Sequence, residues 1–488
     1  MLREDYSIWC CGRHELSLTR PRVMGILNVT PDSFSDGGEN LDPQAAIARA
    51  LQMLDEGADI IDVGGESTRP GHTPVDPEEE GNRVIPVIRG ILAEAPTAIV
   101  SIDTRHAAIA KIAVRLGVSI INDVSGFSDP AMARVAAESN CGCIIMHWSK
   151  IRGVRTRRSV TLDSPRLRSR RPVQPRTVPT STRRFTLPEE APLMREVMGF
   201  LGDQARTLMR ASHRAWPINV NFICIDPGPG FDKSADEDIV IERATRKLVS
   251  MGYPVITALS RKRSVGAVSG IREARERDAA SVGMCLSAIE DGSRIVRVHD
   301  VAATVQAING YWSVAKADAR QAFVSLGSNV GDRVGNLTHA VKLINKIPLT
   351  RVVLVSRAYE TEPAYNIATP VANAVAEIRT ELHPLVLLDA LLGVEDELKR
   401  VRDPKLAGHG PRTIDCDLVF VEGEQHAGKR LTLPHPHLGE RDYVLVPMED
   451  LLHDPVRFLM HAGVPVYAPE ERVGHVVSEL GELDWREE

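Results

Sequence analysis

The apolar run VMGILNV (23–29), the helical pattern PQAAIARALQMLDEG (43–57) and a second apolar run, DIIDVGG (59–65), decide the fold. Both runs are almost continuously apolar, which is typical of parallel strands buried on both faces. The segment between them spaces its apolar residues three and four apart and ends in Gly, which is a helix stop signal. The chain therefore starts a strand–helix–strand unit of the parallel type.

Six further runs continue this pattern, most of them separated by helix-like stretches: AIVSIDT (98–104), SIINDVSG (119–126), CGCIIMH (141–147), FICIDPG (222–228), PVITALS (254–260) and RIVRVHD (294–300). Eight strand–helix units predict a TIM (β/α)₈ barrel. A doubly wound open sheet stays as the competing fold, although open sheets of this length are less common.

Each of the eight runs ends in a polar residue: Asn28, Asp62, Asp103, Asn122, His147, Asp226, Ser260 and His299. A single Asp after a strand is most often the cap of the next helix. Eight such residues in succession are hard to explain by capping. The carboxyl ends of barrel strands form one rim, where active sites are built, so we expect these side chains to converge there.

Composition excludes several classes of protein. Of the 488 residues, 43% are hydrophobic and 25% charged, with a net charge of −6, an ordinary globular balance. No apolar run approaches the roughly 20 residues of a membrane span, and the charged start MLREDYSIWCCGRHE does not resemble a signal peptide. The seven cysteines form no CxxC pair, which indicates free thiols in a reducing compartment. We expect a cytoplasmic protein with no membrane partner.

Residues 149–190 interrupt the pattern after the fifth run. This segment has twelve Lys and Arg against three acids, a net charge of +9, together with five prolines. We interpret it as a disordered, solvated insertion. An arm that attracts nucleic acid is the functional alternative, but Phe185 is the segment's single aromatic residue and nucleic acid is not favoured as a partner.

A second unit follows the barrel. We assign residues 1–20 to an N-terminal extension, 21–312 to the barrel, 313–321 to a linker, 322–462 to a smaller domain and 463–488 to a C-terminal tail. In the smaller domain the runs FVSLGSN (323–329), VVLVSRAYET (352–361), VANAVAEIRT (371–380) and TIDCDLVFV (413–421) alternate with two helical patterns. This order predicts an α+β domain of ferredoxin-like type, with helices packed on a largely antiparallel sheet.

The residues at the barrel rim predict a ligand with two different ends. Asp103, Asn122 and Asp226 can accept and donate hydrogen bonds along the edge of a flat heterocycle. Arg261, Lys262, Arg297 and His299 follow the last two strands and could bind a diphosphate. The Gly-, Ser- and Thr-rich turns at 28–38 and 64–71 offer backbone donors next to Arg69. No GxxxxGK[ST] run is present, which excludes a Walker-type nucleotide loop.

In the second domain the strongest signal is PRTIDCDLVF (411–420). Asp415 and Asp417 lie two apart on a predicted strand, so their carboxylates share a face and can bridge Mg²⁺ ions to nucleotide phosphates. Two solvent-facing acids on an edge strand are the simpler interpretation. Arg412 and the turn at Pro434–His435 add phosphate donors and favour the metal site.

The barrel segments GILNVTPDSFSDGG, DVGGESTRPG, SIDT, INDVSG, DPGPGF, SRKR and RVHD resemble the dihydropteroate synthase family over about residues 20–312. That resemblance implies the condensation of 6-hydroxymethyl-7,8-dihydropterin diphosphate with 4-aminobenzoate. It assigns the pterin to Asp103, Asn122, Asp226 and Lys262, Mg²⁺ to Asn28, and the diphosphate to Arg297 and His299. Thr68 and Arg69 would lie on a loop over the site, and Ser260 would border the aminobenzoate. The resemblance also allows a homodimer formed through the barrel domain, and the sequence does not decide the oligomeric state.

The segments FVSLGSNVGDR, LLGVEDELKRVR, GPRTIDCDL and LPHPHLGERDY resemble hydroxymethyldihydropterin pyrophosphokinase over about residues 321–460. The resemblance implies diphosphoryl transfer from ATP, with Asp415 and Asp417 binding Mg²⁺. It places Asn373 and Tyr443 on the pterin and Glu395 near the nucleotide. The residues that would contact phosphate or transfer charge are Arg400, Arg402, Arg412, His435 and Arg441. No cofactor besides Mg²⁺ is implied, with ATP as co-substrate.

The second domain departs from that family at two points. Val371 stands where the family has an aromatic residue two positions before the Asn, and Gly408 with His409 replaces an Arg–Trp pair. Loss of one aromatic face would weaken pterin stacking. A synthase whose kinase domain is catalytically weakened and serves a structural or regulatory role is therefore the alternative. A nucleic-acid-binding protein acting through the insertion is a further one.

Overall fold

The computed structural model describes residues 7–30, 42–66, 75–148, 192–211, 218–364, 369–402 and 410–486. The chain divides into two compact units: Met1–Ile308 with Ala427–Lys429, and Asn309–His426 with Arg430–Glu488. No helix among the described residues is long and apolar enough to cross a membrane. The Arg-rich segment 149–190 lies outside the described residues, so its expected disorder stays a prediction.

The first unit is built on eight parallel strands: β3 (Arg22–Asn28), β4 (Ile60–Gly64), β5 (Ile99–Asp103), β6 (Ile120–Asp123), β7 (Gly142–Met146), β8 (Ile223–Asp226), β9 (Ile256–Thr257) and β10 (Ile295–Val298). Their spatial order is β8-β7-β6-β5-β4-β3-β10-β9. A parallel bridge between Ile225 and Val255 joins the two ends of this sheet and closes it. The predicted barrel is confirmed, and the open doubly wound sheet is not formed.

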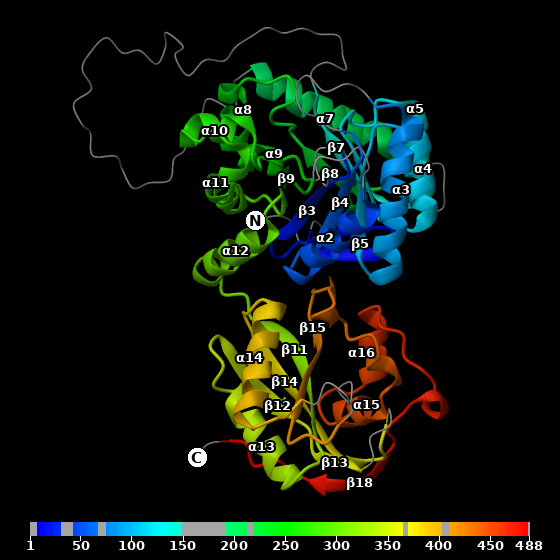
Figure 1. The fold of residues 1–488 in the computed structure, drawn as a ribbon, viewed down its shortest axis with the longest axis vertical. Helices are drawn as coiled ribbons and strands as arrows, with labels where there is room; N and C mark the ends of the chain where they lie inside the picture. Colours follow the sequence, from blue (N-terminus) through cyan, green and yellow to red (C-terminus); the bar gives the residue numbers. More distant parts are fainter. Residues whose placement is uncertain are drawn as a thin grey trace, which may run out of the picture. The chain divides into compact units, whose positions relative to one another are not determined.

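Helices follow the strands in sequence: α2 (Pro43–Asp55), α3 (Pro77–Glu94), α4 (Ala107–Leu116), α5 (Pro130–Ser139), α7 (Pro192–Ala211), α8 (Ala235–Arg243), α9 (Thr245–Val249), α10 (Arg263–Ser269), α11 (Asp278–Glu290) and α12 (Val301–Ala315). Neighbouring helices such as α3, α4 and α5 pack side by side outside the strands (Figure 1). In α2, α3 and α5 an Asp–Pro pair begins the helix, and the Asp side chain accepts the N–H two residues later at 2.8–2.9 Å. The segment PLMREVMGFLGDQARTLMRA forms α7.

A hairpin of β1 (Ile8–Cys11) and β2 (His14–Ser17) closes the end of the barrel opposite the strand carboxyl ends. Trp9 and Leu16 are buried there against Met24, Ile60 and other residues near the strand N-termini. The region that the sequence assigned to an extension therefore completes the barrel core. All seven cysteines are free, as expected from the sequence.

The second unit is an antiparallel sheet covered by helices on both faces (Figure 1). Its strands are β11 (Arg320–Ser328), β12 (Thr350–Val355), β13 (Ala358–Thr361), β14 (Val371–Thr380), β15 (Asp415–Val421) and β18 (Val476–Gly481), in the order β15-β11-β14-β13-β18 with β12 also on β14. Helices α13 (Arg333–Ile344) and α14 (Pro384–Glu397) pack on one face. Helices α15 (Asp442–Met448) and α16 (Pro455–His461) pack on the other. The predicted antiparallel α+β domain is confirmed.

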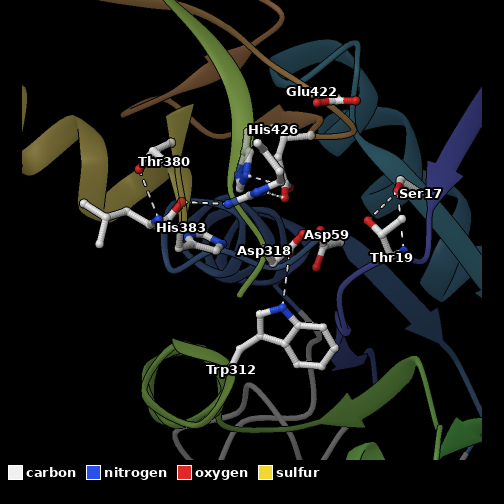
Figure 2. A network of polar contacts seen from close by, with 12 residues as sticks. Ser17, Thr19, Asp59, Trp312, Asp318, Thr380, His383, Glu422 and His426 are labelled. Atoms are coloured by element: carbon white, nitrogen blue, oxygen red, sulfur yellow. Dashed lines mark hydrogen bonds and ion pairs between the residues drawn. The ribbon is translucent and has the colours of Figure 1, made fainter. Parts of the chain in front are cut away.

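Smaller elements complete the described chain: β16 (His426–Ala427), β17 (Thr432–Leu433) and the 3₁₀ turns η3 (Val220–Phe222), η4 (Ala274–Glu276), η6 (Leu438–Glu440) and η7 (Pro469–Glu471). Beside β16, the ring of His426 lies edge-on to that of His383, with centroids 5.3 Å apart (Figure 2).

Three features of the second unit differ from the sequence predictions. The expected tail at 463–488 contributes β18, which pairs with β13, because a strand with a free edge gains backbone hydrogen bonds from a further strand. The single strand expected at 352–361 is divided into β12 and β13. The linker is shorter than expected, since α12 extends to Ala315 and β11 begins at Arg320. Within this connection, Trp312 Nε1 donates to Asp318 at 3.2 Å (Figure 2).

Candidate active sites

The barrel strands place the predicted polar residues at one rim. In the register of neighbouring strands, Asn28 lies opposite Gly64, Gly64 opposite Asp103, and Asp103 opposite Asn122. Residues in register point to the same face of a sheet, and Asp62 lies two residues before Gly64 on that face. Asp226 ends β8 next to Met146 of β7. The row of side chains is thus a direct consequence of where each apolar run stops.

Arg297 lies at the centre of this rim. Its Nε donates to Asp62 Oδ2 at 2.7 Å and its Nη2 donates to Asp103 Oδ2 at 2.8 Å. Asn122 Nδ2 donates to the same Asp62 oxygen at 3.1 Å. Burial acts to lower the pKa of Arg297, but Asp62 and Asp103 outweigh it and the pKa is raised. Arg297 is therefore a permanent cation.

For the carboxyl group of Asp103, burial outweighs the effect of the neighbouring cation on the pKa. Burial raises the pKa of Asp103 to about 7, with the charges of Asp62 and Glu80 acting in the same direction and Arg297 acting against them. Asp103 consequently titrates near neutral pH in the protein without ligand. A heterocycle that donates N–H groups to this carboxyl would favour its charged form.

Lys262 and Asp226 form the neighbouring part of the site. Lys262 Nζ donates to Pro229 O and lies 5.0 Å from the centre of the Phe231 ring. Asp226 Oδ1 accepts the Gly228 N–H at 2.7 Å. Burial raises the pKa of Asp226, opposed by Lys262, and burial lowers the pKa of Lys262, opposed by Asp226. Each of the two groups thus favours the charged form of the other, although both are buried.

Ser260 and His299 occupy the next part of the rim, after β9 and β10. Ser260 Oγ and His299 Nδ1 are 2.9 Å apart, and the His299 N–H donates to the same hydroxyl at 3.2 Å. Ser260 thereby fixes the orientation of the imidazole. Arg261 turns away from this group, because its Nε and Nη2 donate to the two oxygens of Asp278 at 2.7 Å each. Thr68 and Arg69 lie outside the described residues.

In the second unit, Asp415 and Asp417 occupy alternate positions of β15, opposite Gly327 and Ser325 of β11. Cys416 between them faces the apolar core. Burial raises the pKa of Asp417 to about 7, and the charge of Asp415 adds to this effect. Two crowded carboxylates of this kind are the donors that Mg²⁺ combines with substrate phosphates, so the residues fit the ion that the resemblance implies. The described residues contain no group of three or more His, Cys, Asp or Glu arranged for a metal.

Cations surround this acidic pair. Arg412 Nη1 lies 3.1 Å from Asp415 Oδ2, and Arg400 Nη1 contacts the other oxygen of Asp415. Glu395, buried on α14, accepts from Arg400 at 2.6 Å, from Arg402 and from the Cys416 N–H at 2.8 Å. Burial raises the pKa of Glu395, and Arg400 acts against that effect. Glu395 therefore orients two arginines beside the carboxylates.

Of the remaining predicted residues, Arg441 lies beside Asp417 and contacts two others. Arg441 Nη1 is 3.8 Å from Asp417 Oδ2 and 3.4 Å from His435 Nε2, and its guanidinium lies 5.5 Å from the centre of the Tyr443 ring. Burial and the charge of Arg441 lower the pKa of His435 to about 3, so His435 is neutral at pH 7. Asn373, buried on β14, donates to Thr361 Oγ1 at 2.8 Å. His409 lies outside the described residues.

Two participants were missed as site residues in the sequence. Asp62 is fully buried and binds both Arg297 and Asn122, although it was recognised merely as a strand end. Its signal was the parallel between DIID (59–62) and SID (101–103), in each of which apolar strand residues are followed by a carboxylate. Asp442, which lies within the segment LPHPHLGERDY but received no role there, contacts Arg472 and His475.

Together these features define a barrel enzyme with acid and amide side chains beside cationic ones at one rim, followed by an α+β domain with a carboxylate pair surrounded by arginines. Residues 24–299 match the family described as "Pterin binding enzyme", and residues 323–453 match "7,8-dihydro-6-hydroxymethylpterin-pyrophosphokinase (HPPK)". The chain belongs to the pterin-binding enzyme family. It carries a dihydropteroate synthase domain followed by a pyrophosphokinase domain, two enzymatic domains of folate biosynthesis.

Curated relatives and solved structures cover the barrel. The dihydropteroate synthase of Neisseria meningitidis serogroup C is 35% identical over 327 residues, which covers 66% of this chain and 99% of the relative. That of Mycobacterium leprae is 36% identical over 307 residues, covering 61% and 95%. Two structures of Xanthomonas albilineans dihydropteroate synthase, with 4-aminobenzoic acid and with 7,8-dihydropteroate, have TM-scores of 0.52 and 0.51 at 35% and 33% identity. Each is matched over its full length and covers 64% of this chain.

Proposed function

We propose that this chain runs two consecutive reactions. The second domain would make 6-hydroxymethyl-7,8-dihydropterin diphosphate from the pterin alcohol and ATP. The barrel would condense that ester with 4-aminobenzoate to give 7,8-dihydropteroate and pyrophosphate. The observation that carries the proposal is the position of Arg297, which binds Asp62 and Asp103 and lies near enough to Lys262 for its charge to lower the pKa of that group. The ligands named for the Xanthomonas albilineans structures, one a substrate and one the product of this condensation, support the same assignment.

In the barrel, the pterin would bind between Asp103, Asn122, Asp226 and Lys262. Carboxylates accept N–H groups of the aminopyrimidine edge, and the buried Asp226 and Asp103 are the acceptors present. Asn122 is already oriented by its bond to Asp62 and has its carbonyl oxygen left to accept. Lys262, opposite Asp226, would donate to a ring nitrogen or carbonyl of the pterin. Three acceptors and one donor would thus line the edge of a neutral polar ring.

The reaction follows from the charges at the rim. The bond between the pterin methylene carbon and the diphosphate oxygen breaks, and the electron pair leaves with pyrophosphate. Arg297 and His299 would stabilise this developing negative charge, while Asp103 would stabilise positive charge on the ring. The amine of 4-aminobenzoate then forms the new C–N bond and loses one proton. Ser260 would border the aminobenzoate and hold His299 in place.

Asn28 would hold a Mg²⁺ ion together with the diphosphate, since a side-chain amide oxygen and phosphate oxygens suit that hard cation. The ion would neutralise charge on the leaving group. Thr68 and Arg69 would belong to a loop that covers the site. The roles of Thr68 and Arg69 rest on the sequence motif, because these two residues lie outside the described part of the chain.

In the second domain, Asp415 and Asp417 would hold Mg²⁺ against the ATP phosphates, where the ion supplies charge neutralisation. Arg400, Arg402, Arg412 and Arg441 would bind the phosphates, with neutral His435 as a further hydrogen-bond partner; Glu395 would orient the first two arginines near the nucleotide. Asn373 would bind the pterin edge and Tyr443 would stack on the ring. The pterin hydroxyl oxygen attacks the β-phosphorus, AMP leaves, and the hydroxyl proton is released.

A cytoplasmic location and a homodimer through the barrel remain parts of this proposal. The catalytically weakened kinase is its main competitor, motivated by Val371. The intact ring of arginines around Asp415 favours an active kinase over that competitor.

One coupled assay tests the proposal. The protein is incubated with 6-hydroxymethyl-7,8-dihydropterin, ATP, Mg²⁺ and 4-aminobenzoate, and dihydropteroate is measured. We expect product without added diphosphate ester, because both sites are present. Asp415→Asn should lower this coupled rate by about 10²-fold or more, since it removes a group that holds charge at the transferring phosphate, and should keep the wild-type rate when the ester is supplied. Product that requires added ester in the wild type would show a silent kinase domain.

A further inference from the structure

The segment Arg472–Val476, in the region that the sequence assigned to a tail, lies against the part of the second domain that carries Arg441 and Tyr443. The backbone makes two of these contacts: Val473 N–H donates to Glu440 O at 2.8 Å, and Asp442 N–H donates to Val473 O at 3.0 Å. Arg441 and Val473 form a parallel bridge. The chain therefore makes a single parallel β-bridge beside the start of α15.

Side chains strengthen the same contact. Asp442 is largely buried, and its two oxygens bind Arg472 Nη1 at 3.3 Å and His475 Nδ1 at 2.7 Å. Arg472 Nε also donates to Tyr467 O at 2.9 Å. Asp442 lies directly between Arg441 and Tyr443 in sequence, so its orientation limits that of both neighbours.

Gly474 packs directly against the Tyr443 ring. Its φ of +67° lies in the left-handed region that favours glycine. A β-carbon at this position would overlap Tyr443 Cδ1 and lie 3.1 Å from Cε1. The absence of a side chain at Gly474 thus determines where the ring can lie.

The other end of the segment reaches the second pterin residue. Val476 pairs with Thr361 in the β13–β18 register, and Glu362 N–H donates to His475 O at 2.9 Å. Thr361 Oγ1 accepts from Asn373 Nδ2 at 2.8 Å. One short stretch of chain therefore contacts the supports of both Tyr443 and Asn373.

We infer that Arg472–Val476 is a positioning segment of the pyrophosphokinase site. Gly474 fixes the position of the Tyr443 ring for stacking on the pterin. Arg472 and His475 fix the side chain of Asp442, which in turn orients Arg441 and Tyr443. The inference rests on the proposed function of this domain, because Tyr443 is taken as the stacking residue. These positioning residues act on the substrate through Tyr443 or Arg441 and not by direct contact; they are Gly474, Asp442, Arg472 and His475.

The test compares Gly474→Ala with Gly463→Ala. Gly463 has a φ of +76° and no atom within 4 Å of its would-be β-carbon, so its variant carries the same backbone strain without the ring contact. We expect Gly474→Ala to raise the KM for hydroxymethyldihydropterin about five- to tenfold, a partial loss of an aromatic stack. The KM for ATP should change less than about twofold. Gly463→Ala should match the wild type, and synthase turnover with supplied ester should be equal in all three.

His475 provides a second comparison that does not depend on tolerance of Ala at position 474. His475→Ala removes one of the two partners of Asp442 and should raise the pterin KM about two- to threefold, as expected for one lost hydrogen bond. His475→Asn keeps a donor near the same place and should restore most of the effect. A uniform fall in kcat with unchanged KM would indicate a merely structural role and would overturn the inference.

Two outcomes separate this inference from the function on which it rests. If the wild type forms the diphosphate ester and Gly474→Ala has the same pterin KM as Gly463→Ala, the positioning role is wrong and the kinase assignment stands. If the wild type forms no ester from ATP, the kinase assignment fails and this inference fails with it.

Discussion

Arg297 offers the sharpest test of the barrel site, because one guanidinium contacts two carboxylates that belong to different strands. Its Nε and Nη2 reach Asp62 and Asp103 at 2.7 and 2.8 Å, and Asp62 is fully buried. Arg297→Ala would leave both acids without their cation. Arg297→Lys would keep the charge but replace a fork of donors with a single ammonium, which cannot bind both carboxylates in the same geometry.

The expected size of the effect follows from two terms. Removing one preorganised donor to developing charge costs about 3–4 kcal/mol, so Arg297→Ala should lower synthase turnover by about 10²–10³-fold. Breaking a buried ion pair costs about 3–5 kcal/mol of stability when the orphaned acid stays charged. Asp103, whose pKa is already about 7, would take up a proton instead when Arg297 is gone. The loss of stability should therefore be larger at pH 8 than at pH 6.

The assay measures pyrophosphate release by the barrel from supplied diphosphate ester and 4-aminobenzoate. Pyrophosphokinase turnover in the same preparation is the internal control, since that site lies in the other unit and should keep its wild-type rate. Arg297→Lys should recover stability but remain at least about tenfold slower than the wild type, because part of the donor geometry is missing. Turnover of Arg297→Ala within tenfold of the wild type would remove the diphosphate assignment.

Two further variants test the chemistry and the packing of the barrel. The pKa of Asp103, raised to about 7, predicts that synthase kcat/KM rises with pH through about 7, and Asp103→Asn should lose this rising limb in a pH–rate profile. The folded pKa lies above the unfolded value of about 3.9, so the folded state binds more protons between these values and stability falls as pH rises from about 4 to 7. Asp103→Asn should flatten that fall in urea unfolding; an unchanged slope would contradict the raised pKa. Trp9→Ala should lower the barrel's free energy of unfolding by about 3–5 kcal/mol, because this fully buried ring fills the closed end of the barrel. A loss below about 1 kcal/mol would show that the hairpin is not part of the barrel core.

The eight barrel strands could be predicted because each is buried on both faces, which produces a continuous apolar run that stops at a polar residue. The prediction is correct even for β9, which forms just two paired residues, Ile256 and Thr257. In the second domain, Val371–Thr380 was predicted for the same reason, as its strand is covered by two cores. Strands with one exposed face give a weaker signal. The hairpin β1–β2 and the edge strand β18 were accordingly missed.

The sequence predicted which residues belong to the candidate site more completely than it predicted the contacts between them. The motifs place Asp103, Asn122 and Arg297 at one rim, and the structure brings them together. They do not reveal that Arg297 binds Asp62, which lies 235 residues away in sequence. They also suggested Arg261 for the same rim, whereas its guanidinium binds Asp278 on α11. A side chain with several rotamers chooses its partner by what the fold brings near it.

Sequence patterns are enough to predict the order of strands and helices, the parallel and antiparallel character of the two sheets, and most of the polar residues at the strand ends. These properties depend on hydrophobic periodicity and on local signals such as Asp–Pro helix starts, which act over a few residues. The pairing of Arg297 with Asp62 and Asp103, and the approach of the Gly474 backbone to Tyr443, become visible in the folded chain. Both are contacts between segments distant in the chain, and their energies depend on distances and burial that exist after the chain has folded.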